Sequence, residues 1–143
     1  MAFKSHYLII QYLAKDASLS AAVGGRLVLY PEMGYMSDNL PSPYIVVRRE
    51  ACNNVRQTKD DGNEGSLDVD TVSVLVVASD DLQLCNVAGM VRNSLASIDL
   101  PYTDASVGLT LDGYTVSDDG NNYDPDTGKM HTTLRFVCDM IIN

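Results

Sequence analysis

The segment from Lys129 to Ile142 constrains the fold more than any other part of the chain. Apolar residues hold one parity of this segment and mostly polar residues hold the other. The apolar set is Met130, Leu134, Phe136, Cys138, Met140 and Ile142, and the polar set is Lys129, His131, Thr133, Arg135 and Asp139. Because successive side chains of a strand point to opposite faces, the pattern predicts a strand with one buried face and one wet face.

A second strand is predicted just upstream. Its apolar residues alternate up to Leu111, but from Tyr114 onward they fall on the other parity, so we expect a β-bulge near Asp112 and Gly113. The intervening residues 118–128 are rich in Asp, Asn and Gly, which are turn-forming residues. We therefore expect them to join the two strands as an antiparallel pair.

The rest of the chain alternates between helical and strand patterns. We expect a first helix capped by Ser5, a helical turn at residues 16–23, strands at residues 26–30, 44–49 and 69–79, and an amphipathic helix from Asp80 or Asp81. Gly24 and Gly25 should stop the helical turn. The sequence thus predicts an α+β fold, with a mixed, mainly antiparallel sheet of about four to five strands packed with two helices, in the order α-β-β-β-α-β-β.

Length and composition indicate one domain, residues 1–143. A chain of 143 residues can bury a single core, and no apolar run approaches the ~18 residues needed to cross a bilayer. The first residues do not resemble a secretion signal, so we expect the protein to be made in cytoplasm. The three cysteines, Cys52, Cys85 and Cys138, are widely spaced and fit buried, reduced thiols. Polar, Gly-containing residues predict mobile loops at about 53–68 and 118–128.

The charge is unevenly distributed. The formal net charge is -9, but residues 1–59 carry seven bases and four acids, and residues 60–143 carry three bases and fifteen acids. The acidic total argues against a nucleic-acid binder. The asymmetry has two interpretations: acidic loops that keep the chain soluble, or a surface with a basic side and an acidic side.

The triplet Asp126-Thr127-Gly128 raises the question of chemistry. An aspartic protease needs two facing aspartates, and the chain holds one copy of the triplet. A calcium loop is an alternative, because residues 118–126 offer oxygen ligands, but their spacing differs from a known calcium loop. A turn set by Pro125 and Gly128 is the third interpretation. The two histidines, His6 and His131, have no partners at a telling spacing, so no catalytic, cofactor or metal site is predicted.

Four segments carry a resemblance to a known family. They are residues 15–31, from Lys15 to Tyr30-Pro31; residues 40–47, Leu-Pro-Ser-Pro-Tyr-Ile-Val-Val; residues 78–95, a strand end followed by a helix; and residues 123–128, Tyr-Asp-Pro-Asp-Thr-Gly. In this order they resemble the tail-completion, or tail-terminator, proteins of long-tailed bacteriophages. The likeness covers nearly the whole chain and departs from the family pattern in the two polar loops.

The resemblance implies a structural virion protein, not an enzyme. It implies a homo-oligomeric, hexameric ring at the head-proximal end of the tail tube, at the head-tail junction, with the tail tube protein and the head connector or neck protein as partners. DNA would pass through such a ring without specific binding, since an acidic lumen repels phosphates. No membrane and no cofactor is implied. The alternative function is a calcium-dependent binding module that uses residues 118–128.

Ring formation requires that one patch of a subunit meet a different patch of the next. Opposite charges on the two patches would set their register. We therefore expect the basic strand face, or the arginines beside it, to meet an acidic loop of the neighbouring subunit, and the loop at 53–68 to become ordered only on assembly. The candidate interface residues are Arg48, Arg49, Asp60, Asp61, Glu64, Asp124, Asp126 and Arg135.

Overall fold

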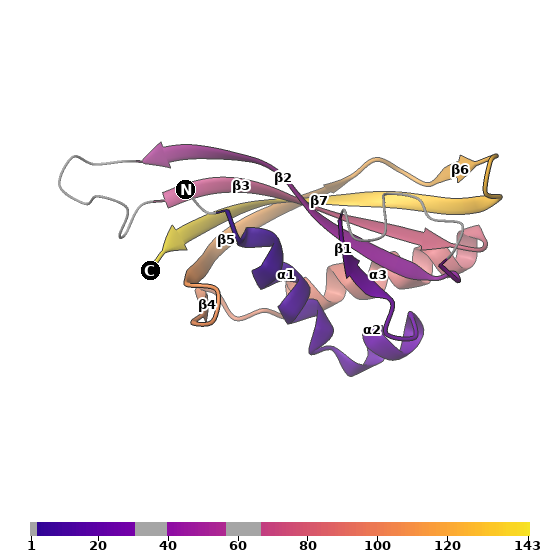
Figure 1. The fold of residues 1–143 in the computed structure, drawn as a ribbon, viewed down its shortest axis with the longest axis horizontal. Coiled ribbons are helices and arrows are strands. Elements are labelled where there is room, and N and C mark those ends of the chain that lie inside the picture. Colours follow the sequence, from indigo (N-terminus) through magenta and orange to yellow (C-terminus); the bar gives the residue numbers. More distant parts are fainter. Residues whose placement is uncertain (1–2, 31–39, 57–66) are drawn as a thin grey trace.

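A seven-stranded sheet carries the fold, and three helices lie along one of its faces (Figure 1). The computed structural model describes residues 3–30, 40–56 and 67–143. The α+β class is confirmed, but the expected four to five strands and two helices were too few. The helical turn expected at residues 16–23 forms α2, which has six residues. The two strands that were missed, β4 and β6, have three residues each. Such segments are too short to show a periodic pattern.

The first two helices, α1 (Ser5–Ala14) and α2 (Ala17–Ala22), follow each other closely. The Asp16 side chain caps α2 by accepting a hydrogen bond from the Leu19 N–H at 3.1 Å. Gly24 and Gly25 then take positive φ values of 60° and 73°, which confirms the predicted stop. The prediction for Ser5 was wrong: Lys4 is the N-cap without a side-chain cap bond, and Ser5 is buried in the first turn.

Helix α3 (Asp81–Ala96) begins where the sequence predicted. The carboxylate of Asp80 accepts a hydrogen bond from the Gln83 N–H at 2.8 Å. The Gln83 side chain returns the contact by accepting one from the Ser79 N–H at 2.9 Å. Donors at the start of a helix have no partner within the helix, so this reciprocal pair fixes where α3 starts.

The seven strands form one ladder of mostly antiparallel pairs. They are β1 (Leu27–Leu29), β2 (Tyr44–Arg56), β3 (Leu67–Ala78), β4 (Tyr102–Asp104), β5 (Leu109–Asp118), β6 (Asn122–Asp124) and β7 (Lys129–Ile142). Their order across the sheet is β1-β2-β3-β7-β5-β4, and β6 pairs with β7 beyond the end of β5. Only the pairing of β1 with β2 is parallel among the described strands.

The predicted bulge in β5 is confirmed. The register with β7 shifts between Leu111, which is opposite Met140, and Gly113, which is opposite Asp139. The shift lets residues of both parities reach the core, since Leu111 is fully buried and the Tyr114 ring packs edge-on against Phe136 at 5.7 Å between centroids. A bulge of this kind re-aims the side chains that follow it.

The two predicted loops are partly strand. Within 53–68, β2 runs on to Arg56 and β3 begins at Leu67, while residues 57–66 lie outside the described part of the chain. Within 118–128, β6 pairs with β7. Both errors have one cause: ladder hydrogen bonds join backbone groups, so a strand can continue through polar residues if its partner strand continues too.

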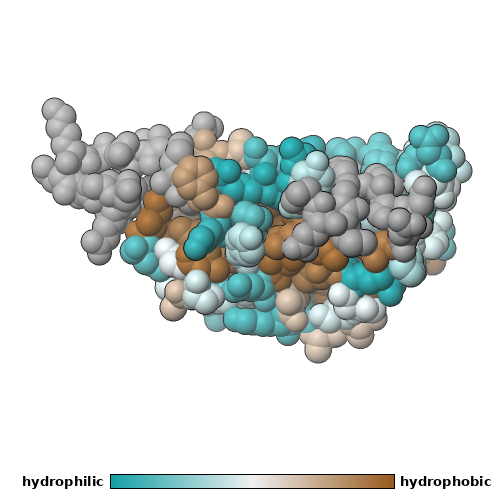
Figure 2. Space-filling model, viewed as in Figure 1, coloured by the Kyte–Doolittle hydropathy of each residue, from teal (hydrophilic) through white to brown (hydrophobic). Residues whose placement is uncertain are grey.

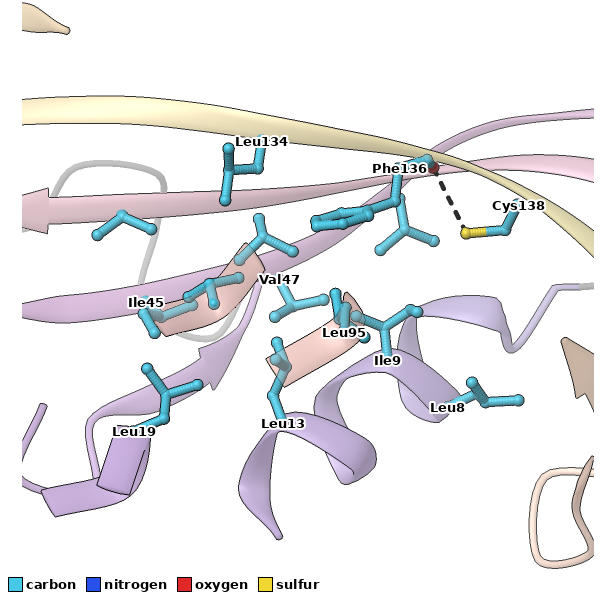
Figure 3. Close-up of a cluster of buried hydrophobic side chains, with 14 of the residues drawn as sticks. Leu8, Ile9, Leu13, Leu19, Ile45, Val47, Leu95, Leu134, Phe136 and Cys138 are labelled. Atoms are coloured by element: carbon cyan, nitrogen blue, oxygen red, sulfur yellow. Dashed lines mark hydrogen bonds between the residues drawn. The ribbon is translucent and has the colours of Figure 1, made fainter. Parts of the chain in front are cut away.

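The main core lies between the sheet and the helices. Figure 3 shows Leu8, Ile9 and Leu13 of α1 and Leu95 of α3 gathered beneath the side chains of β2 and β7. In Figure 2, apolar surface lies in a band between the sheet and the helices on this side of the molecule. Within the described residues, no helix is long and apolar enough to cross a membrane.

The opposite face of the sheet, called the outer face below, has a smaller apolar cluster of its own. Tyr44, Val46, Leu75 and Val77 are all buried there, on β2 and β3. Val28 and Leu40 pack against them. Lys129 closes one side of this cluster, because its ammonium lies 5.3 Å from the Tyr44 ring centroid. The outer face is therefore apolar at one end.

Candidate assembly surfaces

The predicted interface residues fall in two regions. Arg48 and Arg49 lie on β2, and Arg135 lies on β7. Asp124 and Asp126 lie at the turn that joins β6 to β7. The other three candidates, Asp60, Asp61 and Glu64, are outside the described residues.

A polar row crosses the outer face. Arg48, Ser73, Arg135 and Ser117 are register partners on β2, β3, β7 and β5, so their side chains share one face. Arg135 Nε lies 3.2 Å from Glu50 Oε2, and the two side chains are 41% and 23% exposed. Because water reaches both partners, this ion pair is weak and can exchange its partners.

Arg48 is placed by an aromatic contact. Its guanidinium carbon lies 4.9 Å from the centroid of the Tyr30 ring, within the range of a cation–π interaction. Ser73 Oγ donates a hydrogen bond to the Arg48 carbonyl at 3.4 Å. Arg48 is half-buried, so its charged head lies on the outer face beside Tyr30.

Arg49 points to the other side of the sheet. Its Nε lies 3.2 Å from Asp70 Oδ2, and its guanidinium carbon lies 5.0 Å from the ring centroid of Phe3. The Asp70 side chain has no exposed surface. Neighbouring residues of a strand face opposite ways, so Arg48 and Arg49 do not form one basic patch.

Burial dominates the electrostatics around Asp70. Burial raises the pKa of its carboxyl, while hydrogen bonds from Ser5 and Cys52 and the charge of Arg49 oppose this rise. Burial also lowers the pKa of the nearby His6, and the positive charge of Arg49 adds to the decrease. The pKa of the Cys138 thiol is raised to about 12 by burial, so this thiol is not reactive at neutral pH.

The thiols match the sequence prediction only in part. All three cysteines are free. Cys138 is buried as expected, but Cys52 is half-exposed and Cys85 is exposed. Cys85 lies on the solvent side of α3, where its sulfur accepts a 3.4 Å hydrogen bond from the Asn121 side chain.

The Asp-Thr-Gly triplet forms a turn. Asp124 accepts hydrogen bonds from the Gly128 N–H at 2.8 Å, the Asp126 N–H at 3.1 Å and the Thr127 hydroxyl at 2.8 Å. Gly128 has a φ of 71°, which a glycine adopts without strain. Asp124 therefore organises the turn, and Asp126 is exposed at its tip.

The calcium alternative gains no support from this geometry. Asp118 accepts a hydrogen bond from the Gly120 N–H at 2.8 Å, and Asp119 accepts one from the Thr133 N–H at 2.9 Å. Asp118 thus holds the backbone of its own loop, and Asp119 holds the backbone of β7. In the described part of the chain, no three His, Cys, Asp or Glu side chains lie together as a metal site would require.

Four acidic residues gather at one end of the molecule. Asn121 joins the connection between β5 and β6 to α3, since its Nδ2 donates to Asp81 Oδ1 at 2.7 Å. This contact brings Asp118 and Asp119 to the same end as Asp80 and Asp81 at the start of α3. That end is called the acidic end below.

Sequence reasoning missed the two acids that pair with the candidate arginines. Glu50 pairs with Arg135, which is 85 positions away, and Asp70 pairs with Arg49. No local pattern marks either pair, because the register of the sheet brings the partners together. Asp70 offered one signal, as a charged residue that interrupts a predicted strand.

Comparisons with known proteins agree with this description. The family model described as tail completion protein gp17 matches residues 8–138, from α1 to β7. Among solved structures, a chain of the "Virion of native gene transfer agent (GTA) particle" has a TM-score of 0.62 and 18% sequence identity, and the match covers 96% of this chain and 94% of that chain. At this identity, the second likeness shows the fold alone. None of the curated proteins compared with this chain matches it.

The family match covers most of the chain, including most of α1, all of α2 and α3, and most of the sheet. Family membership was therefore predicted correctly from the four quoted segments, and the chain belongs to the tail completion protein gp17 family, a family of structural proteins of the bacteriophage virion.

Proposed function

We propose that this chain forms a hexameric ring at the head-proximal end of the tail tube, where it ends tube growth and presents a docking face to the head connector. The family match over residues 8–138 is the observation that carries this proposal. The fold supports it with a sheet that has one face covered by helices and an outer face that keeps Val137, Thr115 and Ser117 exposed. The partners are further copies of the chain, the tail tube protein and the connector.

The charge distribution supports a heterologous interface in the ring. The polar row holds Arg48 and Arg135 on the outer face, and the exposed Asp126 lies at the tip of the β6–β7 turn. A basic patch and an acidic patch at different places on one subunit can meet across a ring without self-pairing. We propose that Arg48 and Arg135 of one copy face the acidic end and the turn of the next copy.

The proposal does not place the other candidate residues in the contact of Arg48 and Arg135 with the next copy. They are Arg49, Asp60, Asp61 and Glu64. Arg49 is bound to the buried Asp70, so it stabilises the fold of its own subunit. The three acids lie outside the described residues, and their part in the interface stays a prediction. Asp124 supports the interface by holding the turn that presents Asp126.

The acidic balance also suits the passage of DNA. A ring of chains with a net charge of -9 each repels phosphates at short range even in salt. DNA would therefore pass through without specific binding. The particle would be assembled in the host cytoplasm, and the protein would reside at the head-tail junction.

The test is to image tails produced with and without the protein. Without it, we expect tubes of irregular length that do not join heads. With gold-labelled wild-type protein, we expect label at the head-proximal end. Wild-type protein that is absent from tail ends would contradict the proposed function.

The interface is tested by Arg48→Glu with Arg135→Glu, and the matched control is Arg48→Lys with Arg135→Lys. We expect the Glu variant to lose capped tails and the Lys variant to keep them. Arg49 is left unchanged, because its reversal would place a second negative charge beside a buried carboxylate and unfold the protein. Capped tails with the folded Glu variant would rule out the interface but not the function.

A further inference from the structure

The edge of β5 that points away from β7 is paired with another strand along only part of its length. β4 pairs with β5 only at residues 109–111, and β6 pairs with β7 rather than with β5. From Asp112 to Asp118, no described strand pairs with β5 on the edge away from β7. Four residues of this segment are exposed: Asp112, Thr115, Ser117 and Asp118.

The register identifies the backbone groups at this edge. In β2, the Val47 carbonyl accepts a hydrogen bond from the Tyr30 N–H, and the Ile45 N–H donates one to the Arg26 carbonyl. The backbone N–H and C=O groups of Ile45 and Val47 therefore point away from β3. In an antiparallel pair, two opposite residues either bond to each other or both point away from each other, and the two cases alternate along the strands. The registers of β2 with β3, of β3 with β7 and of β7 with β5 therefore carry this assignment across the sheet. It aims the N–H and C=O groups of Tyr114, Val116 and Asp118 outward, away from β7.

A strand edge of this kind is a template for another strand. Self-pairing of two β5 edges is disfavoured, because an antiparallel pair centred on this segment would set Asp112 of one copy opposite Asp118 of the other and bring like charges together. The negative charges of Asp112 and Asp118 therefore favour a partner strand that carries positive charges.

The other side of the same sheet offers such a strand. Among the described residues, β1 pairs with β2 at Ile45–Val47, and β2 continues to Arg56. In the sequence, residues 48–56 hold three arginines and one glutamate, a formal charge of +2 in which Arg49 pairs with Asp70 and Glu50 with Arg135 inside the subunit. Residues 112–118 hold two aspartates and no base. The two edges are on opposite sides of the sheet and complementary in charge.

We propose that β5 of one copy pairs with residues 48–56 of β2 of the next copy, so that the sheets of neighbouring subunits form one continuous ladder. This inference rests on the ring proposed above and specifies how its subunits join. The contact is heterologous, because two different edges meet, and such a contact can close into a ring. It also brings the acidic edge of β5 beside the basic part of β2.

A proline at Val116 tests the ladder directly. The Val116 N–H points away from β7, so proline removes a donor that only the intermolecular ladder uses. Val116→Ala is the matched control: it loses side-chain packing but keeps the N–H. We expect Val116→Pro to lower self-association by at least about tenfold in sedimentation and to abolish rings at tail ends, while Val116→Ala keeps both.

A photo-crosslinking amino acid at Thr115 identifies the partner strand. Thr115 is exposed on β5, and trypsin cleaves after Arg49 and Arg56 to release residues 50–56 as one peptide. We expect a crosslink from position 115 to this peptide in assembled wild-type rings. This readout does not require that the proline variant fold.

The outcomes separate the inference from the function. Wild-type rings at tail ends, with a crosslink to another protein or another segment, would overturn the ladder and leave the proposed function intact. A folded Val116→Pro variant that forms rings as well as Val116→Ala does would also overturn it. Wild-type protein that is absent from tail ends would instead contradict the proposed function.

Discussion

The two faces of the sheet use the same strands for different tasks. On the helix-covered face, Val72 and Phe136 are register partners and both are buried in the main core. On the outer face, one position further along, Ser73 and Arg135 are partners in the polar row. Alternate residues of one strand can thus contribute separately to the core and to contacts with other molecules. The comparison indicates that changes on one face can leave the other intact.

The two ion pairs of the sheet lie on different faces and differ in their exposure to water. Arg49 and Asp70 join on the helix-covered face, where the carboxylate has no exposed surface, while Arg135 and Glu50 join on the outer face within reach of water. Their N–O distances are equal at 3.2 Å. Burial therefore sets the difference in their importance for stability, because water screens only the second pair.

The largest expected effect compares neighbouring residues on β7. Phe136 is 1% exposed and Val137 is 37% exposed. Phe136→Ala should lower the free energy of unfolding by about 3–5 kcal/mol, because it leaves a cavity in the core. Val137→Ala should lower it by less than about 1 kcal/mol. Urea denaturation measures both, and similar losses would contradict the division between the two faces.

The next effect compares the two arginines. Arg49→Ala leaves the Asp70 carboxylate buried without its cation, and we expect a loss of about 3 kcal/mol in the free energy of unfolding. Arg135→Ala should cost less than about 1 kcal/mol, since its partner is solvated. The control is Arg49→Ala combined with Asp70→Asn, which should recover part of the loss. Equal losses for the two single variants would show that burial does not distinguish the pairs.

The smallest effect is a pH dependence of the helix-covered face. Burial and Arg49 lower the folded-state pKa of His6 below its ordinary 6.5. The unfolded chain then binds the proton more readily, so stability is fully present above pH 6.5 and is lost as the pH falls below it. The loss should be less than about 1 kcal/mol between pH 7.5 and 5.5.

His6→Gln provides the control for this pH dependence. The variant keeps the size and polarity of the side chain but has no titration in this range, so its stability should change less between pH 7.5 and 5.5. Denaturation curves at the two pH values give the comparison, and NMR titration of the His6 ring gives its pKa. A His6 pKa above 6.5 would reverse the expected sign.

Much of the fold could be predicted from local patterns. The alternation after Lys129 predicted β7, the parity change near Gly113 predicted the β5 bulge, and Asp80 marked the start of α3. The family likeness was also readable, since its segments are short and lie in order along the chain. These features depend on neighbours in sequence, whose spacing the sequence displays.

The candidate site was predictable only in part. The sequence named Arg48 and Arg49 together as an alternative to the strand face that holds Arg135. In the structure, Arg48 shares the outer face with Arg135, whereas Arg49 points to the core. The extension of β2 to Arg56 was missed because its residues are polar. Asp124 was chosen for its charge, and the structure shows that it accepts the hydrogen bonds that shape a turn.

By itself, the sequence determined the parity of β7, the start of α3, the stop after α2, the turn at Asp126-Thr127-Gly128 and the membership of a family. Only the tertiary structure decided which acids pair with Arg49 and Arg135, how far β2 and β3 extend, and which part of β5 has no second strand beside it among the described residues. The physical reason is the range of the interactions. Hydropathy and local hydrogen bonds act between near neighbours, whereas the register of a sheet is set by backbone pairing between distant segments.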